Sequence, residues 1–212
     1  MLLDISVLDI TLDALRRPDM DRNYQEMFAA IDACYSKALQ LPCVVLIYTT
    51  IDSLGWVAYG HEEQSTRIRF VRWVERYLLA RLDQNCSAID LYAARCSILH
   101  GLAWESDLSK SGKAKSLMYA MGKNTGAVPE LSTKVFSDEH LVCIHVDKLI
   151  ADLKAGVQEF FEEVSKDPNL SAQVKAASGK TYAAVPVAMY EKFVDAIEKL
   201  QASNNSLQAR RP

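Results

Sequence analysis

Residues 91–104 read LYAARCSILHGLAW, and the interpretation of the rest of the chain depends on this stretch. Its apolar residues recur with the 3.6-residue period of an α-helix, which predicts a largely buried helix. One arginine and one histidine, Arg95 and His100, interrupt the apolar pattern. A buried guanidinium without a partner is very costly, so Arg95 needs an acid, an anionic ligand or water at an interface.

The two side chains fall on neighbouring faces of the expected helix. Arg95 shares a stripe with Ile98, whereas His100 shares one with Cys96. At roughly 100° per residue, their separation of five residues places them about 140° apart. A joint site then requires the arginine to curl around the helix, the helix to deform near Gly101, or a second subunit to contribute. We expect the second subunit.

Asp52 is the acid within the chain that is best placed to pair with Arg95. It lies in a second apolar segment, residues 42–60, in a stripe with Tyr48 and Trp56. One interpretation is structural: an Asp52–Arg95 pair fixes the register of two helices, and His100 bonds to a backbone carbonyl. Composition alone favours this interpretation.

Composition and charge exclude several classes of protein. The formal net charge of −3 means that the chain as a whole is not an electrostatic nucleic-acid binder, so any such binding needs a local patch. The cysteines form no CxxC pair, and the histidines do not lie at zinc-ligand spacing from them. We therefore expect no metal, no cofactor and no disulfide framework, and a reducing, cytoplasmic location.

Two apolar segments could be mistaken for targeting signals. The N-terminal run MLLDISVLDITLDALRR carries Asp4 and Asp9 and lacks a basic leader, which argues against a signal peptide. Residues 41–60 approach the length of a membrane span but contain Pro42, Thr49 and Asp52. A buried helix is the better interpretation, and no membrane association is expected.

The periodicity predicts a mainly α-helical protein. Helices are expected over residues 21–39, 42–60 and 66–82. A fourth helix is expected to begin after Ser87, which is a good N-cap, and to include residues 91–104. The short loops between these helices favour an antiparallel bundle. Residues 108–128 are expected to be a loop, with one helical turn around 114–121. Two β-like runs, 133–136 and 140–146, predict a small hairpin.

The C-terminal part is expected to be helical. Asp147 is predicted to cap a helix to residue 165, Asp167–Pro168 to break it, and helical segments to follow at 172–177 and 186–201. We expect a bundle over residues 1–126, the hairpin and C-terminal helices packed on it over 127–203, and a disordered tail over 204–212.

Two groups of basic residues are candidates for binding phosphate. Arg69, Arg72 and Arg76 recur at helical spacing on one face. Such a face is usually solvated and paired with acids, and a phosphate-tracking face is the alternative. Residues 108–128 contain no acidic residue but four lysines, Lys110, Lys113, Lys115 and Lys123. This composition indicates either a solvated loop or a positively charged edge beside a site, in which case Lys113 and Lys115 are the candidates for binding substrate.

The run YAARCSILHG resembles the Arg-x4–6-His signature of the HEPN superfamily. Three further segments fit a branch of bacterial HEPN-like proteins: IYTTIDSLGW at 47–56, FVRWVERYLL at 70–79 and WESDLSKSGKAK at 104–115. The resemblance covers about residues 41–122. Two positions depart from the usual pattern. Cys96 replaces a polar residue after the arginine, and Leu102 replaces the tyrosine found in toxins that are paired with nucleotidyltransferase antitoxins.

The resemblance implies a HEPN-like helical bundle that forms a homodimer, with Arg95 and His100 as the active pair and with Asp52 and Tyr48 in support. Many members are metal-independent endoribonucleases of toxin or defence systems, and an antitoxin protein is then a possible partner. Others are non-catalytic modules that dimerise or bind nucleotide or RNA, and a plain helical scaffold is a third interpretation. For cleavage, histidine can transfer protons near neutrality and arginine can stabilise phosphate oxygens.

Overall fold

The computed structural model describes residues 20–82, 85–122 and 141–178, together with Glu191, Val194, Asp195 and 197–199. The chain divides into two units, and nearly all described residues belong to Met20–Lys180. This unit is mainly helical, as the sequence predicts. It contains α2 (Met20–Ser36), α3 (Gln40–Tyr59), α4 (Thr66–Tyr77), the 3-10 turn η1 (Leu79–Arg81), α5 (Ala88–Gly101), α6 (Asp107–Lys110), β1 (Ser116–Ala120), β2 (Leu141–His145), α8 (Val146–Lys166) and α9 (Pro168–Ser178).

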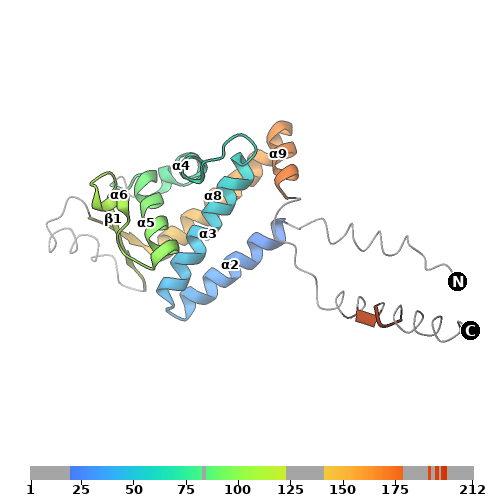
Figure 1. Ribbon diagram of the computed structural model, residues 1–212, viewed down its shortest axis with the longest axis horizontal. Coiled ribbons are helices and arrows are strands. Elements are labelled where there is room, and N and C mark those ends of the chain that lie inside the picture. Colours follow the sequence, from blue (N-terminus) through green and yellow to red (C-terminus); the bar gives the residue numbers. More distant parts are fainter. Residues whose placement is uncertain are drawn as a thin grey trace, which may run out of the picture. The chain divides into compact units, whose positions relative to one another are not determined.

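Helix α3 is the centre of the unit (Figure 1). It contacts α2, α4, α5, α8 and α9, and its buried side chains include Ile47, Ile51 and Leu54 at helical spacing. In the part of the chain that the structure describes, it is the helix whose length and composition would suffice to cross a membrane, and 56% of that apolar window is buried in the protein. The apolar character of the helix is thus explained by the neighbouring helices that cover more than half of this window.

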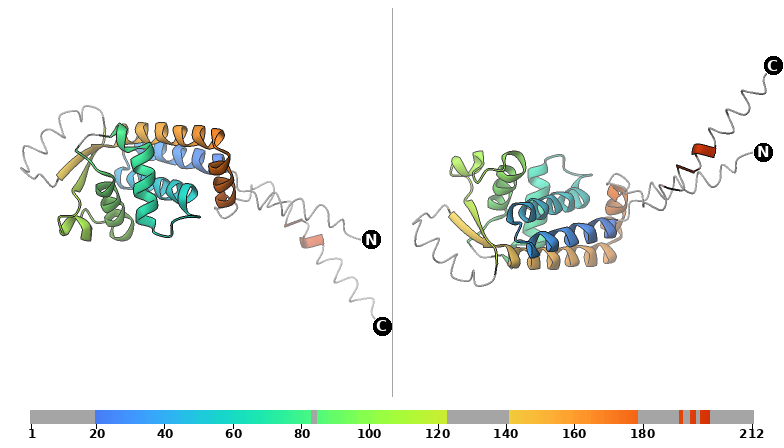
Figure 2. Two further views of the ribbon diagram at one scale, coloured as in Figure 1. Left: turned by 90° about the horizontal axis from the view of Figure 1, so that it is seen from above. Right: turned by 90° about the horizontal axis from the view of Figure 1, so that it is seen from below.

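Helices α2 and α8 run side by side along α3 (Figure 2). Tyr24 of α2 donates or accepts a 3.0 Å hydrogen bond with Ser53 of α3 and packs edge-on against Phe161 of α8. Helix α4 is held to α8 by Glu163, which accepts hydrogen bonds from the Tyr77 hydroxyl and from Arg76. Aromatic and aliphatic side chains from all these helices form one core.

Two glycines permit the closest helix crossings. A Cβ on Gly55 of α3 would lie 3.0 Å from the carbonyl oxygen of Arg69 in α4. A Cβ on Gly156 of α8 would lie only 2.5 Å from the carbonyl oxygen of Tyr77, which ends α4. Only glycine therefore lets α8 approach the end of α4 so closely.

Helix α5 begins as the sequence predicts. Ser87 is its N-cap, and its hydroxyl accepts the Asp90 N–H while the Asp90 carboxylate accepts the Ser87 N–H, which forms a capping box. The same carboxylate accepts the backbone N–H of Lys115 at 2.6 Å, just before β1. Asp90 thus joins the start of α5 to the start of the sheet.

The sheet differs from the expected hairpin. The predicted run 140–146 is strand β2, but it pairs with β1 in parallel, from Ser116↔Leu141 to Ala120↔His145. The first predicted arm, 133–136, lies outside the described residues. The helical turn expected around 114–121 is wrong, because Ser116–Ala120 forms β1. Parallel pairing is possible because the connection between the strands is long enough for a crossover.

Several helix boundaries also differ from the predictions. Helix α4 ends at Tyr77 and continues as a 3-10 turn, so the single helix expected to residue 82 is wrong. Helix α8 begins at Val146, which places Asp147 in the first turn instead of at the cap. Helix α9 begins at Pro168, earlier than expected, since proline fits the first turn of a helix. The tail at 204–212 and most of the helix expected at 186–201 lie outside the described residues.

Candidate functional site

Arg95 and Asp52 form an ion pair between α5 and α3, as predicted. The Arg95 Nε donates to Asp52 Oδ2 at 2.6 Å, and Nη2 lies 2.5 Å from the same oxygen. The side chains are 13% and 17% exposed respectively, so the pair lies at the edge of the core. Asp52 Oδ1 is buried and has no hydrogen-bond partner among the described residues. The pair fixes the register of the two helices.

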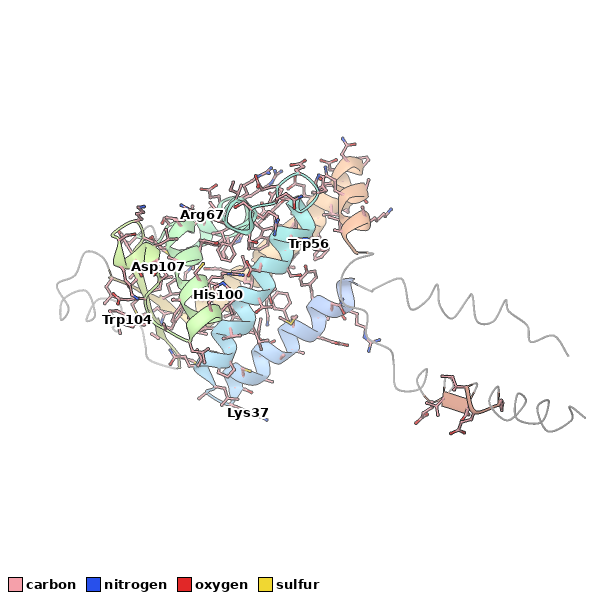
Figure 3. The ribbon with its side chains drawn as sticks, viewed as in Figure 1. Lys37, Trp56, Arg67, His100, Trp104 and Asp107 are labelled. Carbon is pink, nitrogen blue, oxygen red and sulfur yellow. The ribbon has the colours of Figure 1, made fainter. Side chains whose placement is uncertain are left out.

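His100 joins this pair within a single chain. Its Nε2 lies 2.9 Å from Arg95 Nη1, the guanidinium nitrogen that faces away from Asp52 Oδ2. The expectation that a second subunit is needed to bring Arg95 and His100 together is therefore wrong. The long arginine side chain curls around α5 and spans the 140° between the two stripes. Figure 3 shows His100 beside α3, at the C-terminal part of α5.

The contact determines which imidazole nitrogen carries a proton. A guanidinium has only N–H donors, so in this hydrogen bond the Nε2 of His100 is the acceptor and carries no proton. A neutral imidazole then has its N–H at Nδ1. The His100 side chain is exposed, and it can therefore present a donor to a ligand while Arg95 holds its other nitrogen.

The charges of the three groups influence one another. Burial raises the pKa of Asp52 above its usual value, against the opposing influence of Arg95, Arg69 and His100. Burial by itself lowers the pKa of Arg95, but the bond to Asp52 and its charge outweigh that effect and raise it. Arg95 therefore stays charged, and the carboxylate beside it is costly to keep ionised.

Tyr92 is a neighbour of the site that the sequence interpretation did not include. It precedes Arg95 by one helical turn, its ring packs edge-on against Phe70, and burial raises the pKa of its hydroxyl. The hydrogen bond to Cys96 raises that pKa as well, whereas Arg95 lowers it. The spacing of three and four residues from Arg95 and Cys96 was the signal that could have identified it.

Tyr48 lies in another polar contact. Its hydroxyl is hydrogen-bonded to that of Tyr119 in β1, and its ring lies against Phe70. Burial raises the pKa of Tyr48 well above its usual value, so it stays protonated. Among the described residues, no hydrogen bond joins Tyr48 to Arg95 or His100, and its role in support of the site stays a prediction.

The three arginines of α4 are engaged in contacts within the chain. Arg69 donates to the carbonyl oxygens of Glu63 and Gln64 at 2.7 and 2.8 Å. The Arg72 guanidinium lies 4.0 Å from the centre of the Tyr59 ring. Arg76 pairs with Glu163. These partners favour the solvated, paired face over a phosphate-tracking one, and phosphate binding by this face stays a prediction.

The two candidate lysines differ in their surroundings. Lys113 is exposed, whereas the Lys115 Nζ donates to the carbonyl oxygen of Asn85 at 2.9 Å. Lys123 lies outside the described residues. Within the described ranges, no group of three or more histidine, cysteine, aspartate or glutamate side chains could hold a metal ion.

The fold and the site together define a mainly α-helical bundle protein with an Arg–Asp–His cluster at the edge of its core. Comparisons of the chain with protein-family models, with curated proteins and with solved structures found no match.

Proposed function

We propose that the chain is a HEPN-like, metal-independent endoribonuclease that cleaves RNA by transesterification through the 2′-hydroxyl. The observation that carries the proposal is the 2.9 Å contact between Arg95 Nη1 and His100 Nε2, in which a permanent cation and a proton-transfer group meet at the surface. We further propose a cytoplasmic homodimer that acts in a toxin or defence system, with an antitoxin protein as its partner; these points rest on the family resemblance.

Each group has a role in the proposed reaction. When a phosphate oxygen takes the Arg95 Nη1 hydrogen bond, His100 Nε2 is released and can accept the proton of the attacking 2′-hydroxyl. The Nδ1 proton of the same ring can pass to the departing 5′-oxygen, and Arg95 stabilises the charge that develops on phosphorus-bound oxygens. Asp52 is a positioning residue, because its Oδ2 holds Nε and Nη2 and directs Nη1 outward.

The test is cleavage of single-stranded RNA in EDTA by the pure protein, with detection of fragments that end in a 2′,3′-cyclic phosphate. We expect His100→Gln and Arg95→Lys to lower the rate by about 100-fold or more while leaving the circular dichroism spectrum unchanged. Lysine keeps the positive charge opposite Asp52 but lacks the planar fork of donors. His61→Gln is the matched control, because His61 is also an exposed histidine and lies at the end of α3.

A second function is a non-catalytic HEPN-like module that dimerises or binds nucleotide or RNA. It is favoured by the Asp52–Arg95 pair itself, because Asp52 balances the charge of a guanidinium that is only 13% exposed. In that case no RNA is cleaved under any condition, and RNA binding is the same in His100→Gln and Arg95→Lys as in the wild type. That result would exclude the ribonuclease.

A further inference from the structure

Trp104 is a large aromatic side chain on the surface, four residues after His100 in the sequence. It is 64% exposed, and it follows the end of α5 with Leu102, which is 68% exposed. Trp73, in contrast, is fully buried in the core. Two large apolar side chains, two positions apart, therefore lie in solvent, and an exposed aromatic ring of this kind offers a face on which a planar group can stack.

The backbone between His100 and Trp104 is a short, fixed turn. Leu102 has a φ of +47°, a left-handed conformation that costs a non-glycine residue about 1 kcal/mol. The backbone N–H groups of Leu102 and Ala103 bond back to Ile98 and Ser97, which fixes the turn. Four residues span at most roughly 14 Å between Cα atoms, so Trp104 lies within a few nucleotides' reach of His100. Figure 3 labels both side chains around the end of α5.

We propose that Trp104 is a stacking platform for an unpaired base of a single-stranded RNA whose phosphate lies at Arg95 and His100. The proposal rests on the proposed ribonuclease or RNA-binding function. Bases of single strands stack on exposed aromatic rings, whereas the bases of a duplex are not available to do so. A protein partner is the alternative occupant of an exposed tryptophan, and the test below distinguishes the two.

The charges near Trp104 fit a nucleic acid that is held mainly by stacking. Lys110 and Lys113 are exposed downstream of it, and neither forms an ion pair with another described residue. Glu105 and Asp107 lie closer in sequence and offset part of that positive charge. Binding should therefore depend only weakly on salt, in contrast to a site that neutralises many phosphates.

The test uses a 2′-O-methylated single-stranded RNA, which cannot be cleaved through the 2′-hydroxyl, so that binding is measured apart from catalysis. We expect Trp104→Ala to weaken its binding, measured by fluorescence anisotropy of the labelled RNA, by about tenfold or more. Trp104→Phe should stay within about threefold of the wild type, because it keeps an aromatic face. Leu102→Ala is the control for a merely apolar contact and should not change the affinity.

Tryptophan fluorescence gives a second readout. RNA should quench the emission of the wild type and quench that of Trp104→Phe much less, although both bind. Three results would overturn the proposal: an equal loss of RNA affinity in Trp104→Ala and Leu102→Ala, an equal affinity of the wild type for duplex RNA, or a change of oligomeric state in Trp104→Ala by sedimentation. The third result would assign this surface to contact with a second copy of the chain. If stacking is found but natural RNA is never cleaved, the ribonuclease fails and the stacking platform stands.

Discussion

The ion pair between Asp52 and Arg95 allows a quantitative prediction. At the roughly 4 Å separation of two charged groups, an effective dielectric constant near 20 gives an attraction of about 4 kcal/mol before the cost of desolvation. Both partners are largely withdrawn from water, at 17% and 13% exposure. We therefore expect a coupling free energy of about 2–3 kcal/mol between the two side chains, well above that of a surface pair.

The perturbations are Asp52→Asn, Arg95→Met and the double variant, each measured by urea unfolding. Arg95→Met should lower the free energy of unfolding by about 3–5 kcal/mol, because it leaves a carboxylate whose Oδ1 already has no partner among the described residues. Asp52→Asn should cost less than Arg95→Met, below about 2 kcal/mol, because the neutral amide oxygen can still accept a hydrogen bond from Arg95 and the guanidinium keeps its contact with His100. The double variant should cost clearly less than the sum.

The control is a pair on the surface. Lys154 of α8 and Asp32 of α2 lie 2.7 Å apart at 42% and 53% exposure, and their coupling should be below about 1 kcal/mol. A coupling for Asp52 and Arg95 as small as that of Lys154 and Asp32 would refute the reasoning, since it would mean that water screens the pair despite its burial.

Three further predictions follow from particular positions. Gly156→Ala should lower the free energy of unfolding by about 2–3 kcal/mol, because the added Cβ would meet the Tyr77 carbonyl oxygen. Gly101→Ala should raise the free energy of unfolding by about 0.5–1 kcal/mol, because the nearest atom to its Cβ is 3.7 Å away. Equal effects of the two variants in urea titrations would contradict this reasoning. Leu102→Gly should stabilise by about 1 kcal/mol by relieving the positive φ, and a loss of thermal stability would argue against strain. Burial raises the pKa of Asp52 in the folded protein, so the stability of the wild type relative to Asp52→Asn should be greatest below pH 3.8 and should fall as the pH rises through the native pKa of Asp52. If the wild type instead gains stability relative to Asp52→Asn as the pH rises, the attraction to Arg95 dominates over burial.

Local features of the sequence determined most of the helices. The spacing of apolar residues located α2, α3, α4 and α5, because the period of 3.6 residues is set by the backbone and needs no partner. Ser87 was identified as a cap for the same local reason. The cost of a buried guanidinium also predicted that Arg95 would find Asp52, since that acid lies in the other apolar helix.

The tertiary structure alone decided the contacts that depend on which distant groups meet. Residues 116–120 extend into a strand because β2 lies beside them, a partner more than 20 residues away that no local pattern specifies. Arg76 is bound to Glu163 because α8 packs against α4. His100 meets Arg95 because a flexible side chain, held at one end by Asp52, can cross between two faces of its helix. A stripe pattern fixes where each Cβ points, but only packing fixes where a long side chain ends.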